Sequence, residues 1–336
     1  MYFYKFLFYL SLITGTLISI SSHSWMGMWI GLELNLLSII PLMSSTYNAY
    51  ASESALKYFI TQTLASTLIL FSIIMMSIMF MYNSKTMISM SLIMNTAFLM
   101  KMGAAPFHFW FPEIMEGLNW INSLIMLTWQ KIAPMILIMY TNINLNYISF
   151  CIIISMIISG IQGLNQTSLR KILTYSSINH IGWMLSAMMF MESIWNYYFM
   201  IYTLMSFNII FMLNMFNIFY LKQLFITLNP QNMIKLLFNL NFLSLGGLPP
   251  FIGFMPKWIT IQSLINNNFY SLSLIMVIFT LMTLYFYMRI TFSSIILNMN
   301  EISYYKNTMM KNNFIMMLTI LTLISLIFCT LLFNMI

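Results

Sequence analysis

Long apolar stretches follow one another along the whole chain and are separated by short polar breaks. A helix needs ~20 predominantly apolar residues to cross a bilayer. The pattern therefore predicts an all-α polytopic membrane protein, a single transmembrane domain over residues 1–336 with about eleven transmembrane helices. The predicted spans are 4–21, 24–43, 56–81, 87–116, 120–141, 147–163, 171–190, 195–220, 234–265, 271–292 and 314–334.

Two of these predicted spans are too long for one straight helix, and both contain helix breakers. The span 87–116 holds Pro106 and Pro112, and the span 234–265 holds Gly246, Gly247, Pro249, Pro250 and Pro256. Backbone groups freed by such breaks need partners inside the protein or in a wet cavity. Because the two broken spans are an odd number of spans apart, they run antiparallel, as in an inverted repeat of a transporter.

The composition excludes a soluble globular protein, since 61% of the residues are hydrophobic and 6% are charged, against ~25% charged in soluble domains. The net charge of +7 arises from single cations between apolar stretches, with no basic run that would suit nucleic acid. No glycine-rich nucleotide motif and no cysteine cluster for an iron–sulfur centre is present in the sequence. We therefore expect no cofactor in this chain.

The loop charges predict the orientation of the chain. If the N-terminus faces inward, the outward loops carry only Lys85. The inward ends then carry Lys5, Lys57, Arg170, Lys171, Lys222, Lys235, Arg289, Lys306 and Lys311. By the positive-inside rule the N-terminus lies inside, and an odd number of spans places the C-terminus outside.

Three lysines, Lys101, Lys131 and Lys257, fall within predicted spans rather than in loops. A lysine at the centre of a membrane costs ~2.5–3.5 kcal/mol on insertion scales. Each lies near a proline, where freed backbone carbonyls can accept hydrogen bonds from an ammonium. Because desolvation favours the neutral form of an amine, such lysines are candidates for proton exchange. Snorkelling or a fixed ion pair is the structural alternative.

Glu33 is the acid predicted to lie at a comparable depth. A carboxyl group close to Lys101 would hold or release its proton according to the charge on that lysine, so the pair would form a two-state element. The alternative is a static salt bridge that orders the second and fourth spans. The neighbouring Gly27 and Gly31 have the GxxxG spacing of a helix-packing face.

Two histidines, His108 and His180, are candidate proton relays because histidine titrates near neutral pH. A hydrogen-bonded structural role is the alternative for each. Glu113 and Glu116 end the fourth span on the predicted inner side, where they could steer protons.

Five strings together carry a resemblance to a known family. They are residues 25–35 (WMGMWIGLELN), 101–112 (KMGAAPFHFWFP), 129–134 (WQKIAP), 163–171 (GLNQTSLRK) and 245–258 (LGGLPPFIGFMPKW). In content and order they resemble the chain 2 family of mitochondrial NADH–ubiquinone oxidoreductase, most of all its insect members, and the likeness extends over essentially the whole chain.

The resemblance implies an antiporter-like, proton-translocating subunit in the membrane arm of respiratory complex I, an H⁺-translocating NADH:ubiquinone reductase of the mitochondrial inner membrane. The family's key glutamate matches Glu33, its lysines match Lys101, Lys131 and Lys257, and His180 matches a relay position. The resemblance places NAD, FMN, iron–sulfur clusters and ubiquinone in other subunits. The implied partners are other membrane-arm subunits, both antiporter-like and small, together with lipids and without nucleic acid.

With this resemblance, the inner side of the predicted orientation is the mitochondrial matrix. The N-terminus is then expected in the matrix and the C-terminus in the intermembrane space. Two other functions stay open. One is an independent cation/proton antiporter, which would be stable alone rather than only with a large redox complex. The other is a structural membrane-arm subunit whose lysines make static bridges, so that neutral substitutions would spare pumping.

Overall fold

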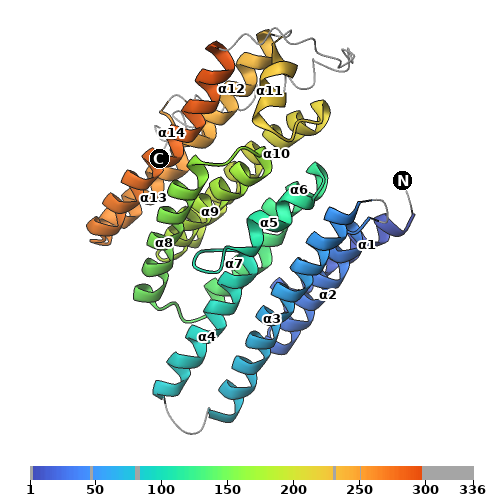
Figure 1. Cartoon of the computed structure of the whole chain (residues 1–336). Helices are drawn as coiled ribbons and strands as arrows, with labels where there is room; N and C mark the ends of the chain where they lie inside the picture. Colours follow the sequence, from blue (N-terminus) through green and yellow to red (C-terminus); the bar gives the residue numbers. More distant parts are fainter. Residues whose placement is uncertain (1–2, 46–47, 80–83, 230–231, 250, 297–336) are drawn as a thin grey trace. The chain divides into compact units, whose positions relative to one another are not determined.

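The computed structural model describes residues 3–45, 48–79, 84–229, 232–249 and 251–296, and the regular elements in these ranges are helices (Figure 1). The chain folds as two compact units, residues 1–151 and 152–336. Helices of the first unit are α1 (Phe3–Ser21), α2 (Trp25–Met43), α3 (Ala49–Met79), α4 (Ser84–Met102), α5 (Trp110–Gly117), α6 (Trp120–Leu127) and α7 (Trp129–Tyr140). Helix α8 (Leu145–Leu164) begins in the first unit and ends in the second, which continues with α9 (Leu169–Met188), α10 (Glu192–Phe216), α11 (Leu221–Leu228), α12 (Asn232–Gly246), α13 (Phe254–Asn266) and α14 (Tyr270–Ile296).

Seven stretches of the described chain are long and apolar enough to cross a membrane. They are α1, α2, α3, the α6–α7 pair (Trp120–Tyr140), α8, α10 and α14, and shorter apolar helices cover Met87–Met102 and Met233–Gly246. An all-α polytopic fold is confirmed, whereas the count of about eleven spans is not. The predicted span 314–334 lies outside the described residues, as do Glu301, Lys306 and Lys311.

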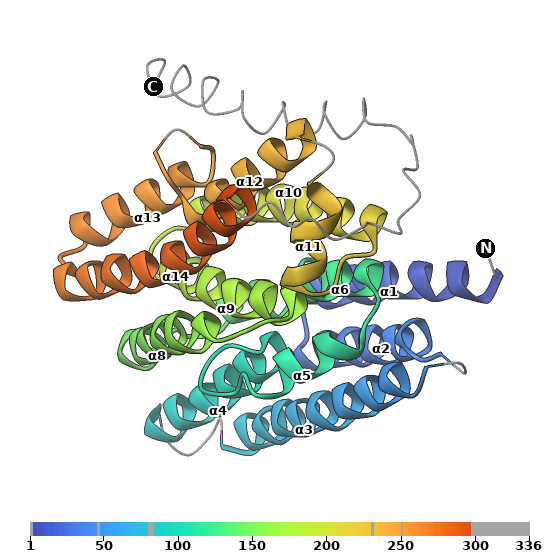
Figure 2. The same ribbon diagram turned by 45° about the horizontal axis from the view of Figure 1, so that its top comes forward.

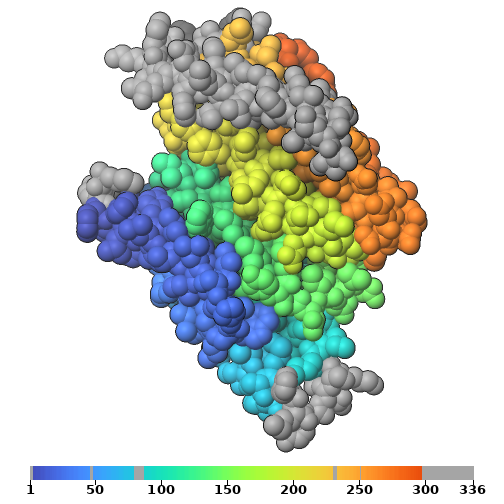
Figure 3. Space-filling view, turned by 180° about the vertical axis from the view of Figure 1, so that it is seen from behind, coloured from blue at the N-terminus to red at the C-terminus, as the bar shows by residue number. Residues whose placement is uncertain are grey.

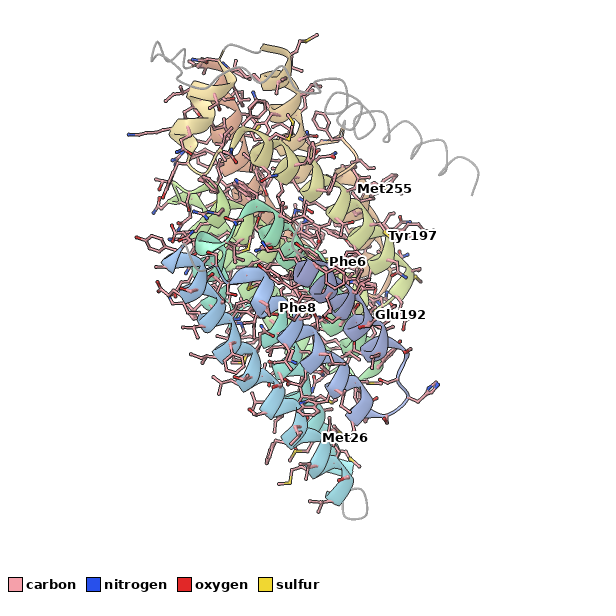
Figure 4. The ribbon with its side chains drawn as sticks, turned by 90° about the vertical axis from the view of Figure 1, so that its right-hand side faces the viewer. Phe6, Phe8, Met26, Glu192, Tyr197 and Met255 are labelled. Carbon is pink, nitrogen blue, oxygen red and sulfur yellow. The ribbon has the colours of Figure 1, made fainter. Side chains whose placement is uncertain are left out.

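The outer faces of these helices are apolar, as a bilayer requires. In the first unit α1, blue in Figure 3, exposes Phe6 and Leu10 according to their fractional exposures of 54% and 48%. In the second unit Tyr197 and Met200 are exposed on α10, which starts at Glu192 (Figure 4). Exposed apolar faces of this kind mark contact with lipid or with another membrane protein.

The helices differ most from the predicted spans in three places. Helix α3 begins at Ala49, ahead of the predicted start at 56. Helix α11 was not predicted, because eight residues are too short for a membrane span; the Gln223 side chain caps it by accepting from the backbone N–H groups of Phe219 and Tyr220. The predicted span 120–141 is divided at Thr128, whose hydroxyl donates a hydrogen bond to the Leu124 carbonyl oxygen at 2.7 Å.

In the first unit α2 packs against α1 and α3 (Figure 1). Helices α1 and α2 approach closely because Gly31 has no side chain: a Cβ there would lie 2.5 Å from the backbone nitrogen of Ser19. This confirms a packing role for Gly31. Gly27 faces Ser22 and Ser24 of the preceding turn instead, so the two glycines do not form one contact face against α1.

The predicted break in the fourth span is present between α4 and α5. Gly103 follows the last residue of α4 with a φ of +71°, and Ala104 N–H donates to the Leu99 carbonyl oxygen at 3.0 Å. Pro112 lies in the first turn of α5, where the N–H that proline lacks has no helical partner to lose.

The second predicted break separates α12 from α13 (Figure 2). Gly247 follows α12 with a φ of +78° and donates its N–H to the Ser244 carbonyl oxygen at 3.0 Å. Pro256 lies in the first turn of α13. Each unit thus contains one interrupted helix with a glycine in the left-handed conformation at the interruption.

Helix α9 is buried along most of its length. It contacts α10, α13 and α14, and every residue from 172 to 188 is buried. Its interior positions include Ser176, Ser177, Asn179 and His180, so a polar stripe runs through a helix that has no exposed face along this stretch.

Candidate functional site

The three lysines predicted inside the membrane are all buried. Their exposed fractions are 7% for Lys101, 1% for Lys131 and 7% for Lys257. Lys101 lies in the last turn of α4, Lys131 in the first turn of α7, and Lys257 in the first turn of α13. Burial of an ammonium is costly unless polar groups or water solvate it, so the surroundings of each lysine determine what it can do.

Lys101 faces a small cavity in the first unit. The cavity has a volume of about 10 Å³, and its lining comes from α2, α3, α4 and α7. Within the described residues, the Lys101 ammonium has no hydrogen-bond acceptor. We expected a backbone carbonyl freed at the break to accept from it. Instead the Trp110 indole N–H donates to the Met100 carbonyl oxygen at 3.2 Å, and Gln62 Nε2 donates to the Lys101 carbonyl oxygen at 3.3 Å.

Glu33 is half-buried on α2 rather than fully enclosed. Its Oε1 atom is inaccessible and has no hydrogen-bond partner in the described part of the chain. Glu33 and Lys101 do not form an ion pair within 4 Å in the described part of the chain. The static salt bridge between the second and fourth spans is therefore not formed in this structure.

The ion pairs of the described residues lie instead at the start of α3. Lys57 Nζ is 3.1 Å from Glu53 and 2.9 Å from Glu113, and both acids are well exposed. Exposed pairs of this kind contribute little to stability, about 0–1 kcal/mol. The pair of Lys57 and Glu113 joins the start of the third predicted span to the end of the fourth. The sequence assigned both of these ends to the inner side.

A group of neutral polar side chains around Lys101 was missed by the sequence reasoning. The group consists of three amides and one phenol, all buried and all lining the cavity: Asn35, Gln62, Gln130 and Tyr58. Gln130 Nε2 donates to Asn35 Oδ1 at 2.9 Å, and the Tyr58 hydroxyl donates to Gln130 Oε1 at 3.4 Å. The signal available in the sequence was the i,i+4 spacing of Tyr58 and Gln62 within an apolar helix, which puts both on one face.

Lys131 is the most deeply buried of the three lysines. Its ammonium lies 5.7 Å from the centroid of the Phe111 ring, at cation–π distance. His108 is also buried, in the break between α4 and α5, and its Nδ1 lies 3.3 Å from the Pro106 carbonyl oxygen. Because a carbonyl only accepts, this contact places a hydrogen on Nδ1.

His180 lies in the second unit on the enclosed helix α9. Its Nδ1 is 2.8 Å from the hydroxyl oxygen of Tyr198, and its ring centroid is 5.0 Å from that of Tyr202. All three side chains are buried. A hydroxyl can donate to or accept from an imidazole, so Tyr198 can follow either protonation state of His180.

Lys257 caps the interrupted helix of the second unit. Its ammonium donates to the Gly246 carbonyl oxygen at 2.9 Å, as expected for a carbonyl freed by a break. The neighbouring Gly247 leaves room for this contact, since a Cβ at that position would lie 2.9 Å from Lys257 Nζ.

The predicted site residues thus fall into two groups. Glu33, Lys101, His108 and Lys131 belong to the first unit, and the others, His180 and Lys257, belong to the second. Within the described residues, no three histidine, cysteine or acidic side chains gather as a metal site would require. Buried amines and an imidazole among hydroxyls and amides are groups that can gain and lose protons.

Comparison with known proteins points to one family. A family model described as NADH:quinone oxidoreductase/Mrp antiporter, TM, matches residues 22–283. The chain is similar to NADH-ubiquinone oxidoreductase chain 2 of Anopheles gambiae, with 54% identity over 92% of this chain and 89% of that one. It is also similar to the protein of that name from Locusta migratoria, with 47% identity over 96% of this chain and 94% of that one.

Solved structures share the fold at lower identity. A chain of respiratory complex I from Thermus thermophilus matches with a TM-score of 0.84 and 20% identity, over 96% of this chain and 79% of that one. A chain of the Mrp complex from Dietzia sp. matches with a TM-score of 0.74 and 14% identity, over 87% of this chain and 60% of that one. At these identities the likeness shows the antiporter-like fold.

Proposed function

This chain belongs to the NADH-ubiquinone oxidoreductase chain 2 family, and from that premise we propose that its buried lysines carry protons across the membrane. As a member of that family it is a proton-translocating subunit of the membrane arm of complex I. The energy comes from redox chemistry in the complex, and the NAD, FMN, iron–sulfur and ubiquinone sites belong to other subunits.

The observation that supports this proposal is the burial of three ammonium groups inside helices. A protein with no use for these charges would lose little by replacing them with methionine, because methionine fills the same space without the desolvation cost. Two of the three also lie at helix interruptions, where backbone groups and cavities can solvate a charge. Retention of the charges is explained if each lysine gains and loses a proton in turn.

The proposed carriers are, in chain order, Glu33, Lys101, Lys131, His180 and Lys257, with His108 as a further candidate. In the first unit a change in the charge on Glu33 alters how firmly Lys101 holds its proton, because opposite charges stabilise each other. In the second unit His180 shares a hydrogen bond with Tyr198, and Lys257 is the terminal carrier. Protons enter and leave in sequence, because a change in the charge on one group alters how firmly the next group holds its proton.

The orientation is part of the proposal, with the N-terminus in the matrix and the C-terminus in the intermembrane space. In the first unit the Lys57–Glu113 pair joins two ends assigned to the inner side. In the second unit Arg289 Nη1 donates to the Leu164 carbonyl oxygen at 3.3 Å, which joins two more such ends. Each of these contacts joins two helix ends that the proposed topology places on the same side of the membrane, which supports that topology.

The alternative function is an independent cation/proton antiporter, since the fold is shared with the Mrp complex chain. Purification separates the two: we expect the chain only in a large redox complex, with other membrane-arm subunits and lipids. A chain that is stable alone and exchanges cations for protons in vesicles would support the antiporter.

The experiment that tests proton carriage uses the whole complex reconstituted in vesicles. In a genetically tractable relative, the equivalents of Lys101→Met and Lys257→Met should each lower NADH-driven proton uptake at equal assembly. Lys222→Met is the matched control, because Lys222 is exposed. Normal pumping in both buried-site variants would support the static structural role instead.

A further inference from the structure

We propose that the second unit binds an anionic phospholipid, with its phosphate at the Arg289 guanidinium and an acyl chain along the outer face of α14. The proposal goes beyond the proposed function, because it assigns a ligand and a binding site to residues that carry no protons. It takes from that function only the name of the leaflet, which is the matrix leaflet in the proposed orientation.

The first observation is an apolar groove on α14. Its volume is about 660 Å³, within the ~300–1,000 Å³ that is typical of ligand clefts. Five aliphatic or aromatic side chains in its lining recur at intervals of three and four residues, so they share one face of the helix. They are Leu281, Leu284, Tyr285, Met288 and Phe292. An apolar surface of this kind marks a contact with lipid or with another protein.

The second observation is the length of the groove below its charged residue. Arg289 also belongs to the lining and lies eight residues after Leu281. At a rise of 1.5 Å per residue, the groove extends ~12 Å along the helix from Arg289 to Leu281. One leaflet contributes ~15 Å of hydrocarbon, half of the ~30 Å core of a bilayer. A chain whose phosphate lies at Arg289 can therefore follow the groove through most of one leaflet.

The third observation is the position of the guanidinium. Arg289 is exposed, and its Nη1 donates to the carbonyl oxygen of Leu164, the last residue of α8, at 3.3 Å. A guanidinium has five N–H donors in a planar fork that matches the oxygens of a phosphate. One bond to a carbonyl holds the side chain beside the loop after α8 and leaves further donors for a phosphate.

Three further cations lie at helix starts close to this loop. Arg170 and Lys171 are in the first turn of α9, and Lys222 is in the first turn of α11. The two helix starts lie side by side, because the residues that precede them, Ser168 and Tyr220, form an antiparallel bridge. Helix α14 contacts both α9 and α11. The basic side chains of three helices therefore gather at one end of the second unit.

This arrangement favours a bound anion. The start of a helix carries partial positive charge and attracts acids, whereas cations are favoured at its end. In the described part of the second unit the one acid is Glu192, which starts α10 beyond the far end of α9, ~30 Å along that helix from its start. The sequence after residue 296 adds Glu301 together with Lys306 and Lys311, so its own charge does not cancel the excess.

The groove and the charges together favour a lipid over other anions. Inorganic phosphate would leave the apolar groove open, and an acidic peptide from the aqueous side would not extend into hydrocarbon. A phospholipid presents a phosphate and then an apolar chain, in the same order as Arg289 and the groove. The first unit has no such excess at the matching end, since Lys57 there bonds to Glu53 and Glu113. Basic residues at the cytoplasmic or matrix surface of a membrane attract anionic lipids.

The first test is a cryo-EM map of the intact complex in nanodiscs, after exchange of its native lipid. Three preparations contain phosphatidylcholine alone, phosphatidylcholine with phosphatidylglycerol, and phosphatidylcholine with inorganic phosphate. We expect elongated density along the groove, ending within hydrogen-bond distance of the Arg289 guanidinium, with phosphatidylglycerol alone.

Three results of these maps would overturn the inference. Equal density with and without phosphatidylglycerol would show unselective lipid. Density at Arg289 without a chain would show an adventitious ion only. A protein helix in the groove, from this chain or from another subunit, would show a protein interface.

The second test removes the charge from the site. In a tractable relative, the equivalent of Arg289→Gln should raise the fraction of phosphatidylglycerol needed to half-fill the groove about fivefold, the factor that one cation near an anionic surface supplies. Lys5→Gln is the matched control, because Lys5 is a cation assigned to the same side of the membrane but lies on α1 in the first unit. Equal occupancy in the two variants would overturn the role of Arg289.

Arg289→Lys keeps the charge and serves if Arg289→Gln does not assemble. It should retain the lipid with a weaker head-group contact, because an ammonium lacks the planar fork. The outcome is separate from that of the proposed function. Lipid in the groove together with normal pumping by Lys101→Met would leave this inference standing and reject proton carriage. An empty groove with reduced pumping by Lys101→Met would reject this inference alone.

Discussion

Lys257 donates a hydrogen bond from its ammonium to the carbonyl oxygen of Gly246, the last residue of α12, at 2.9 Å. The final carbonyls of a helix have no intrahelical donor, and a cation near them is favoured by the helix dipole. The charge on Lys257 is therefore coupled to the shape of the break between α12 and α13. Loss of its proton would remove one of three donors and weaken the cap.

The first prediction concerns the chemistry of this cap. Lys257→Arg keeps a cation that can bond to Gly246 but does not deprotonate under ordinary conditions. If Lys257 carries protons, Arg should impair pumping nearly as much as Met does. We would measure protons pumped per NADH in both variants at equal assembly; normal pumping with Arg would make Lys257 a static anchor.

The second prediction concerns Glu33 and Lys101. Since the two groups form no ion pair within 4 Å in the described structure, we expect each to matter through its protonation rather than through a static bridge. Glu33→Gln and Lys101→Met should each lower pumping, and the double variant should be little worse than the more severe single one, because groups that act as a unit are non-additive. Additive losses in pumping rate would show that the two act independently.

The third prediction concerns the hydroxyl that bonds to His180. Tyr198→Phe removes the 2.8 Å partner of Nδ1 without changing the ring, and one hydrogen bond of about 1 kcal/mol corresponds to roughly a fivefold change. We expect a slower pumping rate of that order. Tyr197→Phe is the control, since Tyr197 is 62% exposed; equal rates for the two variants would show that the hydrogen bond between Tyr198 and His180 does not contribute to pumping.

The fourth prediction concerns orientation. A cysteine introduced by Lys171→Cys, at the start of α9, should react with a membrane-impermeant thiol reagent added from the matrix side of inner-membrane vesicles. The reason is the accumulation of cations at the ends assigned to that side. Reaction only from the intermembrane-space side would reverse the topology.

Much of the fold was predictable because membrane spans leave a strong signal. Backbone groups in a bilayer must bond within their own helix, so each apolar stretch predicts an element and each cluster of glycine and proline predicts an interruption. Both predicted breaks are present, at Gly103 and at Gly247. The division at Thr128 was not predictable, because a threonine hydroxyl that bonds to a carbonyl four residues back is compatible with a continuous helix.

The charged members of the candidate site were also predictable, because a lysine within a long apolar stretch stands out in the sequence and is costly to place in a membrane. The neutral members were not. Gln130 and Asn35 are ninety-five residues apart in sequence and meet only through the packing of α7 near α2. Contacts between elements far apart in sequence also explain why the expectation for Lys101 was wrong. Its position predicted a backbone carbonyl as the acceptor for its ammonium, but side chains of other helices, Gln62 and Trp110, donate to the carbonyls near the break instead.

The central claim is that protons pass through these buried amines, and Lys131 tests it most directly because it is the most deeply buried, at 1% exposure. The measurement is the number of protons pumped per NADH oxidised by the reconstituted complex carrying Lys131→Met, beside Lys222→Met. We predict a reduced number for Lys131→Met at equal assembly and a normal number for the control. A normal number for both variants would contradict the account.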